Sequence, residues 1–214
     1  MPHIYLIPGL GADHRLFHKL IWKPGQTVSA LDWIEPIEAE SIQAYALRMC
    51  GQIDSNKPFI LLGVSLGGIV AIEMAKIIHP EKIILVSSIK NRREKPFYYA
   101  LGKYLNITVW PSIHHTWLFA IMVRVFFGKM NKEEFLLFRD MISHASHDFL
   151  VWSQKAIATW DNMEPFPNLY HIHGTADRAF PPLFIKNYVP VLGGNHYMIV
   201  NNAAQISTWL DGIL

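Results

Sequence analysis

Charged residues are scarce in this sequence. Asp, Glu, Lys and Arg make up 17% of the 214 residues, against a usual share of about 25%. The net charge is only +2, so the charge balance gives no electrostatic case for a nucleic-acid partner. Together with the 51% share of apolar residues, the low charge indicates a large buried core. The chain is long enough for one domain with a substantial core, or for one domain plus an insertion.

Cysteine and long hydrophobic runs are also nearly missing. Cys50 is the only cysteine and cannot form an internal disulfide, which fits a reducing compartment. Its place on an expected helix with an apolar face predicts that it packs in the core. The longest apolar stretch, 117–127, contains Arg124 and is too short to span a bilayer. Residues 1–8 lack the basic start of a signal peptide, so we expect a cytoplasmic protein with no stable membrane anchor.

Short apolar runs alternate with helical patterns along most of the chain. Several of the runs are continuous, as in Lys82-Ile83-Ile84-Leu85-Val86, which is typical of parallel strands buried on both faces. This alternation predicts an α/β fold with a mostly parallel, doubly wound sheet of about six strands. The strands are expected at 3–8, 27–33, 58–64, 82–88, 168–173 and 188–192.

The alternation stops between about 90 and 166, where no strand fits. Asn131 and Ser146 are each placed to cap a helix whose apolar residues fall on one face. We therefore expect a core formed by 1–90 and 167–214, and a helical insertion over 91–166 after the fourth strand. Such an insertion is expected to form a lid over the carboxyl edge of the sheet, and the simpler alternative is a set of additional core helices.

The sequence Gly63-Val64-Ser65-Leu66-Gly67 has the strongest chemical signal in the chain. It follows an apolar strand pattern and precedes a helical one, so it is a G-x-S-x-G at a strand-to-helix turn. A serine at so sharp a turn is strained, and small residues on either side prevent a clash. Its hydroxyl then stands at a helix N-terminus, where the backbone N–H groups favour a developing negative charge. Ser65 is therefore the candidate nucleophile.

Two later segments provide an acid and a base. A serine needs a base to take its proton, and the base needs a partner that fixes its tautomer. Asp177 lies in His173-Gly174-Thr175-Ala176-Asp177 after the fifth expected strand, and His196 lies in Gly193-Gly194-Asn195-His196 after the last. Both follow strand ends, where open α/β sheets place their sites. The order Ser65, Asp177, His196 is that of acyl-transfer enzymes of this architecture.

With these three motifs in order, the chain resembles the α/β-hydrolase superfamily over nearly its whole length. The resemblance implies that Ser65 is the nucleophile, that His196 is the general base and then the general acid, and that Asp177 orients His196. It also implies that the backbone N–H groups of Leu10 and Leu66 form the oxyanion hole. Loss of one such donor typically costs about 3–4 kcal/mol of transition-state stabilisation.

The resemblance also sets expectations for the sheet and the oxyanion loop. It implies a spatial strand order of 2-1-3-4-5-6, with six strands in place of the family's eight. Pro8-Gly9 stands where many members have His-Gly, and Gly9 and Gly11 are expected to let the backbone approach the substrate closely. The short stretch between Asp177 and His196 predicts a turn in place of the helix usual there. No cofactor and no metal are implied.

Other histidines and glycines give weaker signals. His171 and His173 alternate on one expected strand and share a face, a geometry that a metal ion can use, but no cysteine or carboxylate cluster accompanies them at ligand spacing. His173 fits better as part of the acid turn. The segment Gly9-Leu10-Gly11 lacks the third glycine of a dinucleotide fingerprint.

The sequence therefore predicts a serine hydrolase of the carboxylesterase type with a small-molecule partner. We expect it to cleave a carboxylic ester or thioester with a small to medium hydrophobic part, through an acyl-enzyme intermediate. The fold also hosts C–C bond hydrolases and lyases with the same triad, so that reaction remains an alternative. A non-catalytic ligand-binding protein on this scaffold is the third possibility. Nucleophilic Asp enzymes such as dehalogenases are disfavoured by Ser65.

Overall fold

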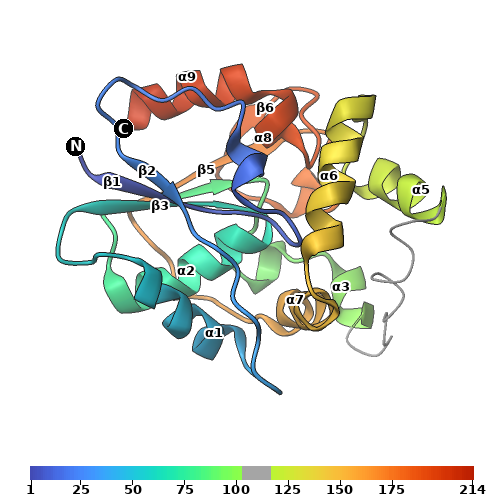
Figure 1. Cartoon of the computed structure of the whole chain (residues 1–214), viewed down its shortest axis with the longest axis horizontal. Helices are drawn as coiled ribbons and strands as arrows, with labels where there is room; N and C mark the ends of the chain where they lie inside the picture. The colour runs from blue at the N-terminus through green and yellow to red at the C-terminus, as the bar shows by residue number, and fades with distance from the viewer. Residues whose placement is uncertain (103–116) are drawn as a thin grey trace.

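Six parallel strands form one central sheet in the computed structural model of the chain (Figure 1). The structure describes residues 1–102 and 117–214. The spatial order is β2-β1-β3-β4-β5-β6, as the resemblance implies, and each neighbouring pair is parallel. The strands are β1 (His3–Ile7), β2 (Val28–Ala30), β3 (Phe59–Val64), β4 (Lys82–Val86), β5 (Leu169–Gly174) and β6 (Val189–Val191).

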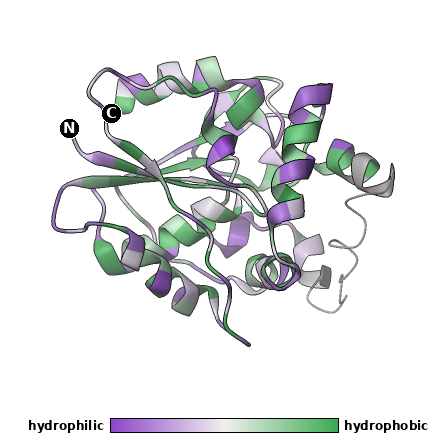
Figure 2. Cartoon of the chain, viewed as in Figure 1, coloured by the Kyte–Doolittle hydropathy of each residue, from purple (hydrophilic) through white to green (hydrophobic). Residues whose placement is uncertain are grey.

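The middle strands are buried because helices cover both faces of the sheet. All six residues of β3 are buried, as are the last four residues of β4. Figure 2 shows these strands mainly in the hydrophobic colour and the surrounding helices in a mixture of both colours. This sandwich explains why the strand sequences are continuous apolar runs rather than alternating ones.

Helices α1 (Ile42–Met49) and α2 (Leu66–Ile78) lie on one side of the sheet, and α8 (Met198–Asn201) and α9 (Ala203–Ile213) lie on the other (Figure 1). Helix α2 packs at the centre, and ten of its 13 residues are buried. Because α2 begins directly after β3, the β3–α2 turn is held between two of the most buried elements of the fold.

The described part of the segment between β4 and β5 consists of helices and loops. It contains α3 (Phe97–Gly102), α5 (Trp117–Phe126), α6 (Lys132–His144) and α7 (His147–Thr159). Figure 1 shows these helices grouped beyond the carboxyl ends of the strands. The caps are those expected: Asn131 and Glu134 form a capping box on α6, and the Ser146 hydroxyl accepts from the Phe149 N–H on α7. Two further histidines of this segment, His114 and His115, lie outside the described residues.

Short 3-10 turns complete the chain. They are η1 (His14–Phe17), η2 (Cys50–Gln52), η3 (Arg92–Glu94) and η4 (Pro182–Phe184). As predicted, no longer helix stands between Asp177 and His196, only η4 and the edge strand β6. The prediction that Cys50 lies on a helix and is buried in the core needs correction. Helix α1 ends at Met49, so Cys50 begins the η2 turn and is only half-buried at the margin of the core. Within residues 1–102 and 117–214, no helix is both long and apolar enough to cross a membrane.

Candidate active site

Ser65 stands at the β3–α2 turn in a strained backbone conformation. Its φ of 53° and ψ of −118° lie outside the regions that L-residues ordinarily occupy. The two flanking glycines are sterically required. A Cβ on Gly63 would lie 2.3 Å from the Gly67 carbonyl oxygen, and a Cβ on Gly67 would lie 2.1 Å from the carbonyl oxygen of Ile7. The G-x-S-x-G pattern is therefore explained by backbone contacts on both sides of the turn.

A second serine, from the end of β4, holds the strained turn in place. The Ser88 hydroxyl donates to the Ser65 carbonyl oxygen over 2.7 Å, and the Ser65 N–H donates to the Val86 carbonyl over 3.1 Å. Ser88 is fully buried. Gly68 makes room for it, because a Cβ there would lie 2.4 Å from Ser88 Oγ. No role for Ser88 was predicted from the sequence. The position of Ser88 just after a strand is the feature of the sequence that could have indicated one.

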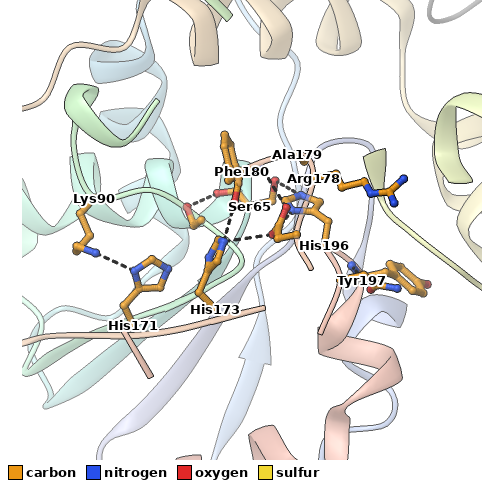
Figure 3. Close-up of polar contacts among 12 residues, drawn as sticks. Ser65, Lys90, His171, His173, Arg178, Ala179, Phe180, His196 and Tyr197 are labelled. Atoms are coloured by element: carbon orange, nitrogen blue, oxygen red, sulfur yellow. Dashed lines mark hydrogen bonds and ion pairs between the residues drawn. The ribbon is translucent and has the colours of Figure 1, made fainter. Parts of the chain in front are cut away.

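Ser65, His196 and Asp177 meet at the carboxyl edge of the sheet, and Figure 3 shows Ser65 and His196 there. His196 Nε2 lies 3.0 Å from Ser65 Oγ, and His196 Nδ1 lies 2.8 Å from Asp177 Oδ2. A carboxylate only accepts, so Nδ1 carries the proton and Nε2 is free to accept from the serine hydroxyl. Asp177 is 2% exposed and His196 is 4% exposed, so the arrangement is shielded from water.

Backbone and side-chain contacts fix Asp177 in its turn. Its Oδ1 accepts from the Phe180 N–H over 2.9 Å. His173, at the end of β5, contacts the Phe180 carbonyl oxygen through Nε2 at 2.8 Å and lies 3.5 Å from Asp177 Oδ2. Tyr98 on α3 donates its hydroxyl to the Ala179 carbonyl, so α3 also holds this turn.

The loop after β1 lies against the serine turn. A Cβ on Gly9 would lie 3.6 Å from Ser65 Cβ, an ordinary contact distance. The Gly9 carbonyl accepts from the Ala12 N–H and from the Trp33 indole N–H, over 3.0 and 3.2 Å. Trp33, which lies after β2, was not predicted from the sequence because nothing local links it to this loop.

Leu10 and Leu66 place their backbone N–H groups on the two segments that meet at Ser65. Neither N–H donates to an acceptor within residues 1–102 and 117–214. The expectation for Gly11 needs correction. Gly11 has a φ of 67°, and a Cβ there would lie 2.9 Å from Ile142 on α6. It therefore allows α6 to pack onto the loop, rather than a substrate to approach it.

A small cavity of about 30 Å³ opens beside the Ser65 hydroxyl. Two aromatic rings stand edge-on to His196: Phe127 at 5.1 Å and Phe180 at 5.6 Å between ring centroids. They shield the imidazole and limit its rotation. Apart from Ser65 and His196, the cavity lining is mostly apolar, and it consists of Gly9, Leu10, Ala12, Leu16, Val64, Phe127, Phe138, Tyr197 and Ile199.

The remaining histidines do not assemble a metal site in the described part of the chain. No group of three or more His, Cys, Asp or Glu there is placed to hold a metal ion. His171 and His173 do share a face of β5, with ring centroids 5.2 Å apart, and His171 accepts from the Lys90 ammonium. Burial lowers the pKa of both imidazoles, that of His171 further. His144 and His147 are exposed.

Comparison with known proteins gives one family and many similar folds. The family model described as "Alpha/beta hydrolase family" matches residues 4–207. No curated protein matches the sequence.

Three solved structures illustrate the likeness. The enol-lactonase from Burkholderia xenovorans LB400 superposes with a TM-score of 0.76 at 17% identity, over 99% of this chain and 90% of that one. A thermophilic esterase from Thermogutta terrifontis gives 0.70 at 14% identity, over 99% and 89%. A hydrolase from Oleispira antarctica gives 0.72 at 12% identity, over 100% and 90%. At these identities the likeness establishes the fold.

Proposed function

Since this chain belongs to the alpha/beta hydrolase family, we propose that it is a serine hydrolase that cleaves a carboxylic ester or thioester. The observation that carries the proposal is the unbroken set of contacts from Asp177 through His196 to Ser65, at 2.8 and 3.0 Å. A nucleophile, a base within hydrogen-bond reach and a group that orients the base are what acyl transfer needs.

The proposed reaction has two halves. Ser65 Oγ attacks the substrate carbonyl carbon while His196 Nε2 takes the hydroxyl proton, and the N–H groups of Leu10 and Leu66 bind the resulting oxyanion. His196 then gives that proton to the leaving alcohol or thiol, and the acyl group stays on Ser65. In the second half a water gives a proton to His196 and attacks the acyl carbon, and the proton returns to Ser65 as the acid is released. Asp177 stabilises the imidazolium in both halves.

The lining of the cavity supports an apolar acyl group. Leu16, Phe127 and Phe138 present only hydrocarbon to the space beside Ser65. The cavity beside Ser65 has a volume of only about 30 Å³, which favours a short acyl chain. A longer chain needs displacement of the Phe127 or Phe138 side chain. We therefore propose a small to medium hydrophobic substrate, with the insertion over 91–166 acting as the lid that sets its size.

A panel of esters and thioesters of increasing acyl length tests this function. We expect turnover by the wild type, and a loss of more than about 10⁴-fold in kcat for Ser65→Ala. Asp177→Asn is the matched partner, because it keeps the shape of the side chain but favours the wrong imidazole tautomer. Hydrolysis that survives Ser65→Ala would refute the proposal. Ligand binding without turnover of any ester or thioester would favour a binding protein.

The same assay separates the C–C bond alternative. A β-diketone or an enol-type substrate with no ester bond is offered to the wild type in parallel. Turnover of that compound with none of the esters would replace ester hydrolysis by C–C bond cleavage on the same triad.

A further inference from the structure

His173 is linked to the carboxylate of Asp177 through two hydrogen bonds of the Phe180 backbone. Its Nε2 lies 2.8 Å from the Phe180 carbonyl oxygen, and the Phe180 N–H donates over 2.9 Å to Asp177 Oδ1. The same Nε2 lies 3.5 Å from Asp177 Oδ2, the oxygen that contacts His196. Figure 3 shows the His173 ring joined to Phe180 by a dashed line, with His171 and Lys90 beside it. His173 and Asp177 are both buried.

The partners of His173 determine its tautomer. A carbonyl oxygen only accepts, so Nε2 carries the proton and Nδ1 is bare. Nδ1 is buried and has no hydrogen-bond partner among the described residues. Burial lowers the pKa of His173, against the opposing effect of Asp177, so the ring is neutral at physiological pH. A neutral ring donates to the turn without placing a second positive charge beside Asp177.

Lys90 and His171 lie next to His173 and help to orient its ring. The Lys90 ammonium lies 2.9 Å from His171 Nδ1 and 2.9 Å from Glu94 Oε1, and it also donates to the Lys186 carbonyl. An ammonium only donates, so His171 accepts and is neutral as well. The His171 ring stands edge-on to His173, with centroids 5.2 Å apart, and the Tyr188 ring packs against His173 at 5.6 Å. These two rings hold the His173 imidazole in one orientation.

We propose that His173 is a positioning residue for Asp177. It holds the Phe180 peptide through the carbonyl, and that peptide in turn holds Asp177 Oδ1 through its N–H. Asp177 Oδ2 is then kept in line with His196 Nδ1, and the carboxylate is prevented from rotating. The inference rests on the proposed function, because it assigns His173 to the same site.

Kinetics of His173→Leu, His173→Gln and His173→Asn test the role. The Gln amide reaches the position of Nε2 and restores the donor, whereas the shorter Asn does not. We expect kcat to fall by about 10²-fold in His173→Leu and His173→Asn, as for a small misplacement of a catalytic group, with KM changed by less than about twofold. His173→Gln should recover to within about tenfold of the wild type.

The pH profile separates positioning from folding. If Asp177 is displaced, the His196 imidazolium loses support, so the acid limb of kcat/KM should move to lower pH. The control is Met49→Ala, which removes a buried side chain from α1, a helix that takes no part in the contacts of the Asp177 turn among the described residues. It should lose stability and keep the acid limb. Equal activity in all three His173 variants, or a loss that follows only their thermal stability, would overturn the proposal.

A readout independent of turnover keeps the two proposals distinct. In the wild type, the Nδ1 proton of His196 bonded to Asp177 is expected as a downfield, slowly exchanging proton NMR signal. His173→Leu removes the donor and should shift or broaden that signal. If His173→Leu does not fold, the comparison is made between His173→Asn, which should change the signal, and His173→Gln, which restores the donor and should keep it. If the wild type hydrolyses nothing, the proposed function fails while this signal still decides the role of His173. An unchanged signal in folded variants would refute that role.

Discussion

Replacement of Ser65 by glycine should give a more stable protein than replacement by alanine, and both variants should lack activity. Ser65 is held at φ 53° and ψ −118°, and a non-glycine residue in such a region costs about 1–3 kcal/mol. Glycine adopts these angles freely, but it raises the entropy of the unfolded chain, which costs about 0.5–1 kcal/mol. Since the Ser65 angles fall even outside the left-handed helical region, we take the upper part of the strain range.

When the entropic cost of glycine is subtracted from the strain energy, Ser65→Gly should be more stable than Ser65→Ala by about 1–2 kcal/mol. Ala is the right reference because it removes the hydroxyl and keeps the strained Cβ. For a chain of this size, the gain corresponds to about 2–8 °C in Tm. Urea denaturation and thermal scans of the two variants measure it directly.

The matched control is the same pair of substitutions at Ser29. This residue is exposed on β2, where glycine has no strain to relieve. There Gly should be less stable than Ala by about 0.5–1 kcal/mol. If Ser65→Gly is as stable as Ser65→Ala or less stable, with Ser29 behaving as expected, the strain argument for the turn is refuted.

Three further predictions follow from the packing and the buried histidines. Gly67→Ala places a Cβ 2.1 Å from the Ile7 carbonyl oxygen and should lower kcat/KM by at least about 10²-fold. Gly212→Ala, where nothing lies within 4 Å of the added Cβ, is the control and should keep its activity, and a fully active Gly67→Ala would contradict the steric account. Phe138→Leu should move the preferred acyl chain of an ester series to greater length, because Phe138 lines the cavity beside Ser65, and an unchanged optimum would exclude Phe138 as a determinant of size. Burial lowers the pKa of His171 in the folded state, so as the pH falls the unfolded chain binds a proton before the folded chain does. The free energy of unfolding should therefore fall by up to about 1.4 kcal/mol per pH unit below about pH 6.5. Denaturation at several pH values should show a smaller slope in His171→Asn, and an unchanged slope in that variant would contradict the prediction.

The parts of the site that sequence could predict are those whose chemistry is local. The turn around Ser65 needs glycines at fixed positions, so the pattern is visible without a fold. Asp177 and His196 each follow a strand, and parallel strands bring their carboxyl ends to one edge. These two facts were enough to place the three side chains together, and the family resemblance supplied the strand order.

The supporting contacts could not be predicted because they join distant segments. Ser88 reaches Ser65 only because β4 pairs with β3. Trp33 reaches Gly9 only because β2 pairs with β1. His173 was assigned to the acid turn, but its bond to the Phe180 carbonyl depends on how that turn closes. The cavity size likewise depends on side-chain packing between the insertion and the core, which has no periodic sequence signal.

The most direct test of the central claim is intact-mass labelling with a fluorophosphonate probe, which reacts only with an activated serine. The account predicts one phosphonyl adduct on the wild type, mapped to Ser65, absent from Ser65→Ala and formed much more slowly in Asp177→Asn. A folded wild type that acquires no adduct, or an adduct that persists in Ser65→Ala, would contradict the account.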